Sequence, residues 1–362
     1  MAAPITLDFK KTNDDKRYFN SSIAGNNFVL NEDPHVLRPS GNFSTQYNQS
    51  ILDKPNEYYL AVMRLQVPTS DIPVFIADPF DPATDPNELV YEVGLVYNGI
   101  TYTKKVEWIP LDNNTGQNNQ YYWIQNYNLF LYMINQALEQ LLALIPSPPA
   151  GALAPYFIFD PTTRLFSFVA QQAIYGQSVV APINVLLNYP LLVLFEGLSV
   201  TLLTTSANNA TFQVLMLEAA NNYYQPANVA VANPPIYLIN TQTNPSISAW
   251  NPMKSIQVTS SSLPVVQEIV PSSQNSNILG GVSIIKDFVP LLASGEAPTS
   301  SIDFINEGPY QLINLTGEVP ITKMDLSVRW VDKYGRIYPI LIPYNSILSI
   351  KLGFFKKSTF TS

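Results

Sequence analysis

Cysteine is absent from this sequence of 362 residues, and histidine occurs only once, as His35. Without cysteine the chain can form no disulfide, no thiolate nucleophile and no cysteine-ligated metal centre, which favours a reducing cytosolic site of assembly over secretion. A single histidine also excludes the zinc sites that are built from several imidazoles. His35 stands in the polar segment Asn31–Leu37, and no serine-nucleophile motif accompanies it, so we interpret it as a solvated loop residue.

Charged residues are also scarce, at 13 % of the chain compared with about 25 % in an ordinary soluble domain. The 19 basic and 27 acidic residues give a net charge of −8. Nucleic acid is therefore not expected as a partner, because its binders normally carry a basic face. Hydrophobic residues reach 46 %, which is enough for a buried core and excludes intrinsic disorder. Since no run of about 18 apolar residues and no signal-peptide pattern occur, no membrane span is predicted.

The few charges are unevenly distributed along the chain. Between Leu165 and Met253, a span of 89 residues, only Glu196 and Glu218 are charged. A free monomer usually keeps its surface soluble with charge, so this stretch predicts surface that is buried against neighbouring molecules. A loop-rich domain with an uncharged polar surface is the alternative that the pattern leaves open.

A mostly β chain is predicted, because 30 prolines interrupt helices and bound short strands. The length fits two domains or one all-β domain with a large insertion. The clearest strands lie near the C-terminus, where apolar and polar residues alternate. Their apolar faces are Met324, Leu326, Val328 and Trp330 in the first strand and Leu348, Ile350, Leu352 and Phe354 in the second. Further strands are predicted at residues 58–67, 255–259 and, after a turn at 332–335, 337–342.

Two hairpins are predicted in the middle of the chain. The dipeptide Asn98-Gly99 joins strands at residues 89–97 and 100–108, since both residues accept the positive φ of a type I′ turn. The second hairpin joins residues 156–159 to residues 165–168 through the turn at 160–163.

One helix is predicted to interrupt the strands. Apolar residues recur at helical spacing from Phe130 to Leu141, either Asn126 or Asn128 can cap the start, and Pro146 closes the end. An apolar stripe of this kind is typical of a helix that packs on a core.

The densest acidic cluster consists of Asp78, Asp81, Asp85 and Glu88. A calcium ion needs oxygen ligands gathered by a tight loop, whereas prolines follow three of these residues and force extended or turn backbone. We therefore interpret the cluster as a proline-rich acidic connector. No catalytic, cofactor-binding or metal-binding residue is predicted, and no cofactor. Paired carboxylates that meet in space, as in a glycoside hydrolase, stay open because their sequence spacing is unconstrained.

Four segments resemble the penton, or minor capsid, proteins of virophages and Polinton-like viruses. They are PYQLINLTGEVPITKMDL at residues 309–326, RWVDKYGRIYPI at 329–340, IKLGFFKK at 350–357 and MKSIQVTSSSLPVVQE at 253–268. The resemblance is a pattern of strands and turns, and it covers about the last third of the chain.

The resemblance implies a single jelly roll of two packed antiparallel sheets, interrupted by a mostly β insertion domain that contains the one helix. It also implies a structural protein, not an enzyme, of which five copies ring each vertex of an icosahedral virion and contact the major capsid protein. Such a virion is assembled in the host cytoplasm, and the insertion domain is a candidate for contact with a host receptor.

The uneven distribution of strands and charge suggests where these parts lie. We expect an N-terminal arm at residues 1–30, the jelly roll at 31–85 and 246–362, and the insertion domain at 86–245. Two alternatives of other classes remain at this point. A receptor- or carbohydrate-binding fibre head would share the β content and the 21 tyrosines, and a β-sandwich glycoside hydrolase would need one carboxylate pair.

Overall fold

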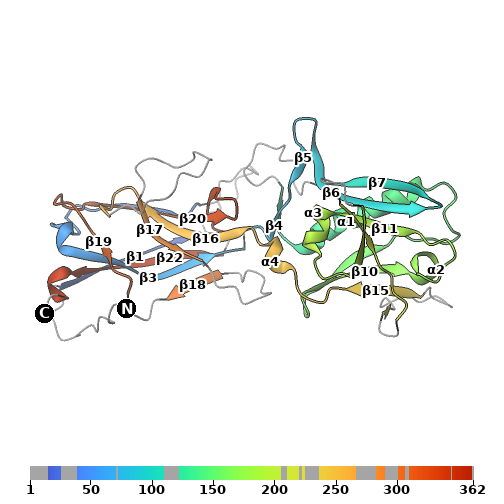
Figure 1. The fold of residues 1–362 in the computed structure, drawn as a ribbon. Coiled ribbons are helices and arrows are strands. Elements are labelled where there is room, and N and C mark those ends of the chain that lie inside the picture. Colours follow the sequence, from blue (N-terminus) through green and yellow to red (C-terminus); the bar gives the residue numbers. More distant parts are fainter. Residues whose placement is uncertain are drawn as a thin grey trace. The chain divides into compact units, whose positions relative to one another are not determined.

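The computed structural model divides the chain into two compact units (Figure 1). It describes residues 15–25, 39–70, 72–109, 122–204, 210–219, 222–224, 236–265, 283–289, 301–305, 310–343 and 345–360. Of these, unit 1 holds the residues up to Ile72 and from Met253 onward, and unit 2 holds those from Pro73 to Pro252. His35 lies outside the described residues.

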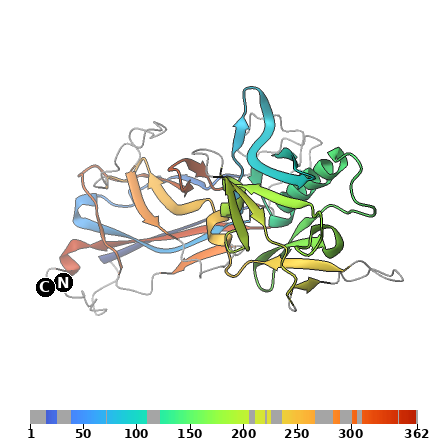
Figure 2. The same cartoon turned by 45° about the vertical axis from the view of Figure 1, so that its right-hand side comes forward.

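Unit 1 consists of two antiparallel sheets, which lie one above the other in Figures 1 and 2. The first sheet has the order β1 (Lys16–Ala24), β22 (Ile347–Lys356), β3 (Tyr58–Pro68), β18 (Ser301–Ile305), with β19 (Ile313–Asn314) also beside β3. The second has the order β17 (Ser283–Phe288), β16 (Met253–Ser260), β20 (Lys323–Asp332), β2 (Asn42–Gln46), with β21 (Ile337–Pro339) also beside β20. Two 3₁₀ turns accompany them, at Pro55–Glu57 and Lys357–Thr359.

The alternation of apolar residues explains the core of unit 1. All eight apolar residues that define the inner faces of β20 and β22 are buried, which confirms both predicted strands. One of them, Leu348 in β22, reaches the second sheet, because a Cβ on Gly41 beside β2 would lie 3.3 Å from Leu348 Cδ1. The two sheets therefore share one apolar layer, as expected for a sandwich.

Two parts of unit 1 differ from the sequence prediction. Residues 16–24, predicted as part of an N-terminal arm, form β1 and pair with β22 along their whole length. The sequence shows no alternating apolar pattern here, because β1 is an edge strand in which Phe19 is the only large buried side chain. The predicted strand at 337–342 is shorter, because pairing with β20 ends at Pro339 and only an isolated bridge at Leu341 follows.

The described residues of unit 2 form three antiparallel sheets and four helices. Its largest sheet has the order β12 (Val200–Thr204), β13 (Thr211–Val214), β11 (Asn184–Asn188), β6 (Asp85–Tyr97), β5 (Pro79–Asp81), with β7 (Ile100–Glu107) also beside β6. The next has the order β14 (Tyr223–Tyr224), β15 (Tyr237–Thr241), β10 (Leu165–Gln171), β9 (Tyr156–Asp160), and β4 (Phe75–Ile76) pairs with β8 (Trp123–Ile124). The helices are α1 (Tyr127–Leu144), α2 (Gln172–Tyr175), α3 (Tyr189–Leu194) and α4 (Ile247–Trp250).

Local sequence accounts for the predicted elements of unit 2. The Asn98 φ of 50° and the Gly99 φ of 75° confirm the tight hairpin between β6 and β7. The second predicted hairpin is formed by β9 and β10. The Asn126 side chain accepts a hydrogen bond from Leu129 N at 2.9 Å and so caps α1, the predicted helix. The other three helices, of four to six residues, were not foreseen from the sequence.

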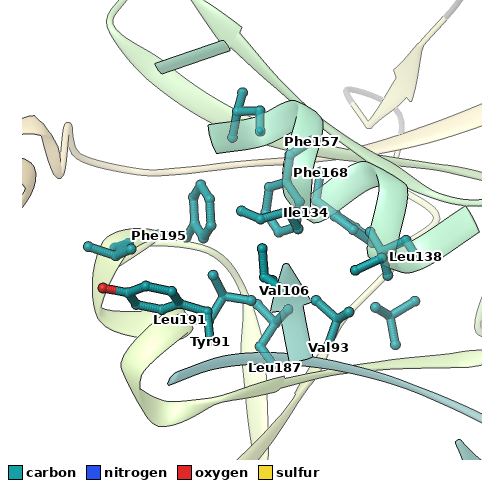
Figure 3. Packing of buried hydrophobic residues seen from close by; sticks show 14 of the residues in the cluster. Tyr91, Val93, Val106, Ile134, Leu138, Phe157, Phe168, Leu187, Leu191 and Phe195 are labelled. Carbon is teal, nitrogen blue, oxygen red and sulfur yellow. The ribbon is translucent and has the colours of Figure 1, made fainter. Parts of the chain in front are cut away.

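The core of unit 2 lies between α1 and the sheets (Figure 3). Ile134 and Leu138 on one face of α1 pack with Val93 and Val106 of the β6–β7 hairpin and with phenylalanines of β9 and β10. Trp250 at the end of α4 is completely buried, and its ring stacks on Phe166 with centroids 4.8 Å apart. Its Nε1 donates to the carbonyl of Leu194 at 2.7 Å.

The first and last elements of unit 2 meet in this core. The ring of Phe75 in β4 lies 5.2 Å from that of Trp250. The contact places both residues in unit 2, which runs from Pro73 to Pro252, whereas the expected insertion ran from 86 to 245. Residues 73–85 and 246–252 carry side chains that the core of unit 2 needs.

A serine-rich turn after β16 in unit 1 holds a half-buried carboxylate. Asp325 of β20 accepts hydrogen bonds from Ser262 N at 2.7 Å, from Ser260 Oγ at 3.1 Å and from Ser261 Oγ. Burial alone would raise the pKa of Asp325, but the hydrogen bonds from the three serines outweigh it and hold this pKa below its ordinary value. The ionised carboxylate of Asp325 therefore links β20 to the segment that follows β16.

This arrangement predicts a pH dependence of unfolding. Because the folded-state pKa of Asp325 is lowered, its contribution is complete above the unfolded-state value and is lost as the pH falls through the folded value. We expect the wild-type chain to lose more stability than Asp325→Asn between neutral and acidic pH. Melting temperatures of both proteins across this range test the prediction, and parallel curves would contradict it.

Candidate assembly surface

The acidic cluster forms a hairpin whose carboxylates are spread along it. Asp81 accepts from Thr84 Oγ1 at 2.6 Å and from Ala83 N at 3.2 Å, and these hydrogen bonds lower its pKa. Asp85 accepts from Asn87 N at 2.9 Å, and Glu88 pairs with Lys105 Nζ at 3.0 Å. The predicted connector is thus the β5–β6 hairpin. Among the residues that the structure describes, no group of three or more acidic or histidine side chains could hold a metal ion.

We expect neither a chelator nor added calcium to change the melting temperature of the chain. The carboxylates of Asp81, Asp85 and Glu88 already have hydrogen-bonding or ionic partners, so the chain gains little by gathering them round a cation. Differential scanning fluorimetry of the wild type and of the triple variant Asp78→Asn, Asp81→Asn, Asp85→Asn measures this. A chelator that destabilises the wild type but not the variant would identify a structural cation site.

The charge-poor stretch forms much of unit 2 and exposes large apolar side chains. Val180 is fully exposed, at 102 % of its reference area, and Ile236 is 58 % exposed. The exposed set within this stretch is Val180, Tyr189, Val193, Leu202, Leu203, Leu217, Tyr223 and Ile236. Most of these residues belong to two groups of neighbouring segments.

The first group, which we name the α2 patch, surrounds helix α2. It consists of Leu153, Val180, Leu217, Tyr223 and Ile236. Hydrogen bonds bring segments that carry these residues close to one another: Gln172 N donates to Ile236 O at 2.9 Å, Leu153 N donates to Gln171 Oε1 at 2.7 Å, and Asn222 Nδ2 donates to Leu217 O at 3.1 Å. The patch therefore rests on main-chain groups of fixed geometry.

Glu218 holds the loop of the α2 patch in place. Its carboxylate accepts from Ser178 Oγ at 2.6 Å, from Ser178 N at 3.1 Å and from Gln172 Nε2 at 3.3 Å. The hydrogen bonds from Ser178 lower the pKa of Glu218. A Cβ at Gly176 would lie 2.5 Å from Glu218 Oε1, so glycine permits this close approach. Glu218 thus anchors the loop that carries Val180.

The second group, which we name the β12 patch, consists of Tyr189, Val193, Leu202 and Phe212. Tyr189 and Val193 are four residues apart on α3 and so share one face of the helix. The Tyr189 ring lies 6.3 Å from that of Phe212, which is opposite Leu202 in the pairing of β12 with β13. In Figure 1, α2 and α3, the helices to which the two patches belong, stand apart within unit 2.

The sequence predicts the charge-poor stretch, but it does not predict the α2 patch or the β12 patch. Scarcity of charge between 165 and 253 is visible in composition, whereas Leu202 and the buried Leu187 look alike in sequence. Only the pairing of the strands separates exposed leucines from core leucines. Within the described ranges, no helix is long and apolar enough to cross a membrane.

Comparison with known proteins relates the whole chain to one family. A family model described as Sputnik minor capsid protein V18/19 matches residues 18–357. The chain is 39 % identical over 207 residues to Structural protein V19 of Sputnik virophage, covering 56 % of this chain and 94 % of that protein. It is 39 % identical over 134 residues to Uncharacterized protein V18 of the same virophage, covering 32 % of this chain and 78 % of that protein.

Solved structures agree with this result. A chain in the cryo-EM structure of the Sputnik virophage matches with a TM-score of 0.81 and 35 % identity, over 95 % of this chain and 98 % of that one. The crystal structure of the mavirus penton protein matches with a TM-score of 0.64 and 17 % identity, over 94 % and 99 % of the two chains, and so shares the fold. The predicted all-β jelly-roll fold is confirmed. The chain belongs to the Sputnik minor capsid protein V18/19 family and is a structural protein of the capsid.

Proposed function

We propose that this chain is a penton, five copies of which form a ring at each five-fold vertex of an icosahedral virion. The observation that carries the proposal is its match, over nearly the whole of both chains, to a protein named as a penton. A closed ring requires contacts of the head-to-tail kind, in which two different surfaces of each copy meet. The α2 patch and the β12 patch of unit 2 are uncharged, apolar surfaces that are suited to such contacts.

The same proposal gives the two units different roles. Unit 1, the jelly roll, contacts the major capsid protein of the virion, and unit 2 is the insertion domain and the candidate for contact with a host receptor. The chain is not an enzyme and needs no cofactor or metal. Its assembly takes place in the host cytoplasm, which suits a chain without cysteine.

The two alternative functions lack a supporting observation. A receptor-binding fibre head and a β-sandwich glycoside hydrolase would share the β content, but the relatives found are capsid proteins. The exposed tyrosines Tyr18, Tyr189 and Tyr223 are equally compatible with protein contacts.

Native mass spectrometry of the full chain tests the penton proposal. The chain mass is 40.3 kDa, and we expect a species of five times that mass at low and at high salt. Uncharged contacts are little affected by salt because there are few ion pairs to screen. A monomer that persists at high concentration in both buffers would overturn the proposal. A trimer that binds glycans would instead support the fibre head.

A further inference from the structure

We propose that the α2 patch of one copy binds the β12 patch of the next copy, so that unit 2 contributes its own head-to-tail contact to the ring. This inference rests on the proposed penton function and adds the surfaces through which unit 2 takes part. The patches lie on different sheets of unit 2, the α2 patch beside β14–β15–β10 and the β12 patch on β12–β13. Each copy therefore offers two unlike apolar surfaces, as a head-to-tail contact requires.

Electrostatics selects a second copy of the chain as the occupant. With a net charge of −8, two copies repel one another over most of their surfaces. Repulsion is smallest where charge is absent, and both patches belong mainly to the stretch whose only charges are Glu196 and Glu218. Glu218 is already engaged by three hydrogen bonds. Neither patch includes a charged residue, so an anionic or cationic partner would find no opposite charge among the patch residues themselves.

An unprotected edge strand in the largest sheet of unit 2 also favours a second copy of the chain as the partner. Within the described part of the chain, β12 pairs only with β13 and is an edge strand, and its sequence Val-Thr-Leu-Leu-Thr contains neither charge nor proline. The strand β7 elsewhere in this sheet carries Lys104, Lys105 and Glu107. Exposed edges are normally protected from pairing by charge or proline. The β12 edge lacks that protection, as expected for an edge that another copy covers.

The α2 patch is preformed, which favours binding. Glu218 fixes the loop of Val180, and hydrogen bonds at Gln171 and Gln172 fix Leu153 and Ile236. A main chain held in one geometry loses little conformational entropy on association. Tyr223 in this patch and Tyr189 in the β12 patch are exposed tyrosines, a residue type enriched in protein interfaces.

Single charge substitutions in the full chain test the proposal. In the α2 patch the variants are Ile236→Glu and Val180→Glu, and in the β12 patch Leu202→Glu and Tyr189→Glu. Ile100→Glu at the tip of the β6–β7 hairpin is the matched control, because Ile100 is 56 % exposed and Ile236 is 58 % exposed. All of these side chains are exposed, so melting temperatures should stay close to that of the wild type.

The expected readout is the fraction of chain in rings at one fixed concentration, measured by native mass spectrometry. Each patch variant should reduce that fraction by at least about tenfold, since a carboxylate buried without a partner costs more than one factor of ten in affinity. The control should assemble like the wild type. If all four patch variants form rings as well as the wild type and the control do, the proposed contact between the patches is overturned. The patches would then bind another partner, such as a receptor or the major capsid protein.

Mixing the variants tests the head-to-tail arrangement. Ile236→Glu keeps an intact β12 patch and Leu202→Glu keeps an intact α2 patch, so an equal mixture should form heterodimers that neither variant forms alone. A like-to-like contact would give no heterodimers of this kind and would overturn the pairing of the two patches. A wild-type chain that never forms rings would instead remove the penton proposal itself, and with it this contact.

Discussion

Deletion of residues 346–362 should leave unit 1 unfolded. The deletion removes β22, which pairs with β1 on one side and with β3 on the other along almost its whole length. It also removes four completely buried side chains of the inner face. Truncation of one such side chain typically costs about 2–5 kcal/mol, whereas a whole domain is stable by only about 5–15 kcal/mol. Loss of all four therefore costs about 8–20 kcal/mol, which together with the lost strand pairing is enough to unfold the unit.

Solubility and hydrogen exchange of the truncated chain measure this effect. We expect the amides of β3 and β20 to exchange as in an unfolded chain. The truncated unit 1 has no folded state that protects them. A milder pair of variants provides the control within the same strand. Leu352→Ala should cost about 2–5 kcal/mol because Leu352 is completely buried, and Lys356→Ala should cost about 0.5 kcal/mol or less. A truncated chain that stays folded and assembles would contradict the assignment of β22 to the core.

Replacement of Trp250 by alanine should destabilise unit 2 by about 3–5 kcal/mol. The Trp250 ring contacts those of Phe75, Phe130 and Phe195 and stacks on Phe166. Alanine removes all of these contacts and leaves a cavity that the surrounding rings cannot fill without leaving their own rotamers.

Hydrogen exchange resolved by peptide is the appropriate measurement, because a chain with two units need not unfold in one step. Protection should fall in α1 and β10 and stay unchanged in β22. Trp250→Phe should cost less than Trp250→Ala, since it keeps the aromatic packing and the carbonyl of Leu194 still accepts from Ser246 Oγ at 2.6 Å. Tyr132→Ala on the exposed face of α1 is the control. Equal loss of protection in both units would show that Trp250 acts on the whole chain.

Elements with a strong local signal were predictable from the sequence. The alternation from Met324 to Trp330 predicts β20 because period-two patterning fits only a half-buried strand. Asn98-Gly99 predicts its turn because these two residues tolerate positive φ. The cap at Asn126 follows from the same kind of local chemistry.

Elements that depend on distant partners were not predictable. β1 contains one buried apolar residue, Phe19, and becomes a strand only because β22 offers its edge. The short helices α2, α3 and α4 have too few residues for a periodic pattern. The patches on unit 2 combine residues as far apart as Leu153 and Ile236, so only the fold brings them together.

The contact between Phe75 and Trp250 has an evolutionary consequence. Their rings hold the two ends of unit 2 together at 5.2 Å, so the chain leaves β3 and returns to β16 through neighbouring points. A segment whose ends are adjacent can be lengthened, replaced or removed while the host strands keep their pairing. Unit 2 thus has the form of an exchangeable cassette. A replacement of unit 2 at these two junctions alone would therefore leave the strand pairing of unit 1 intact.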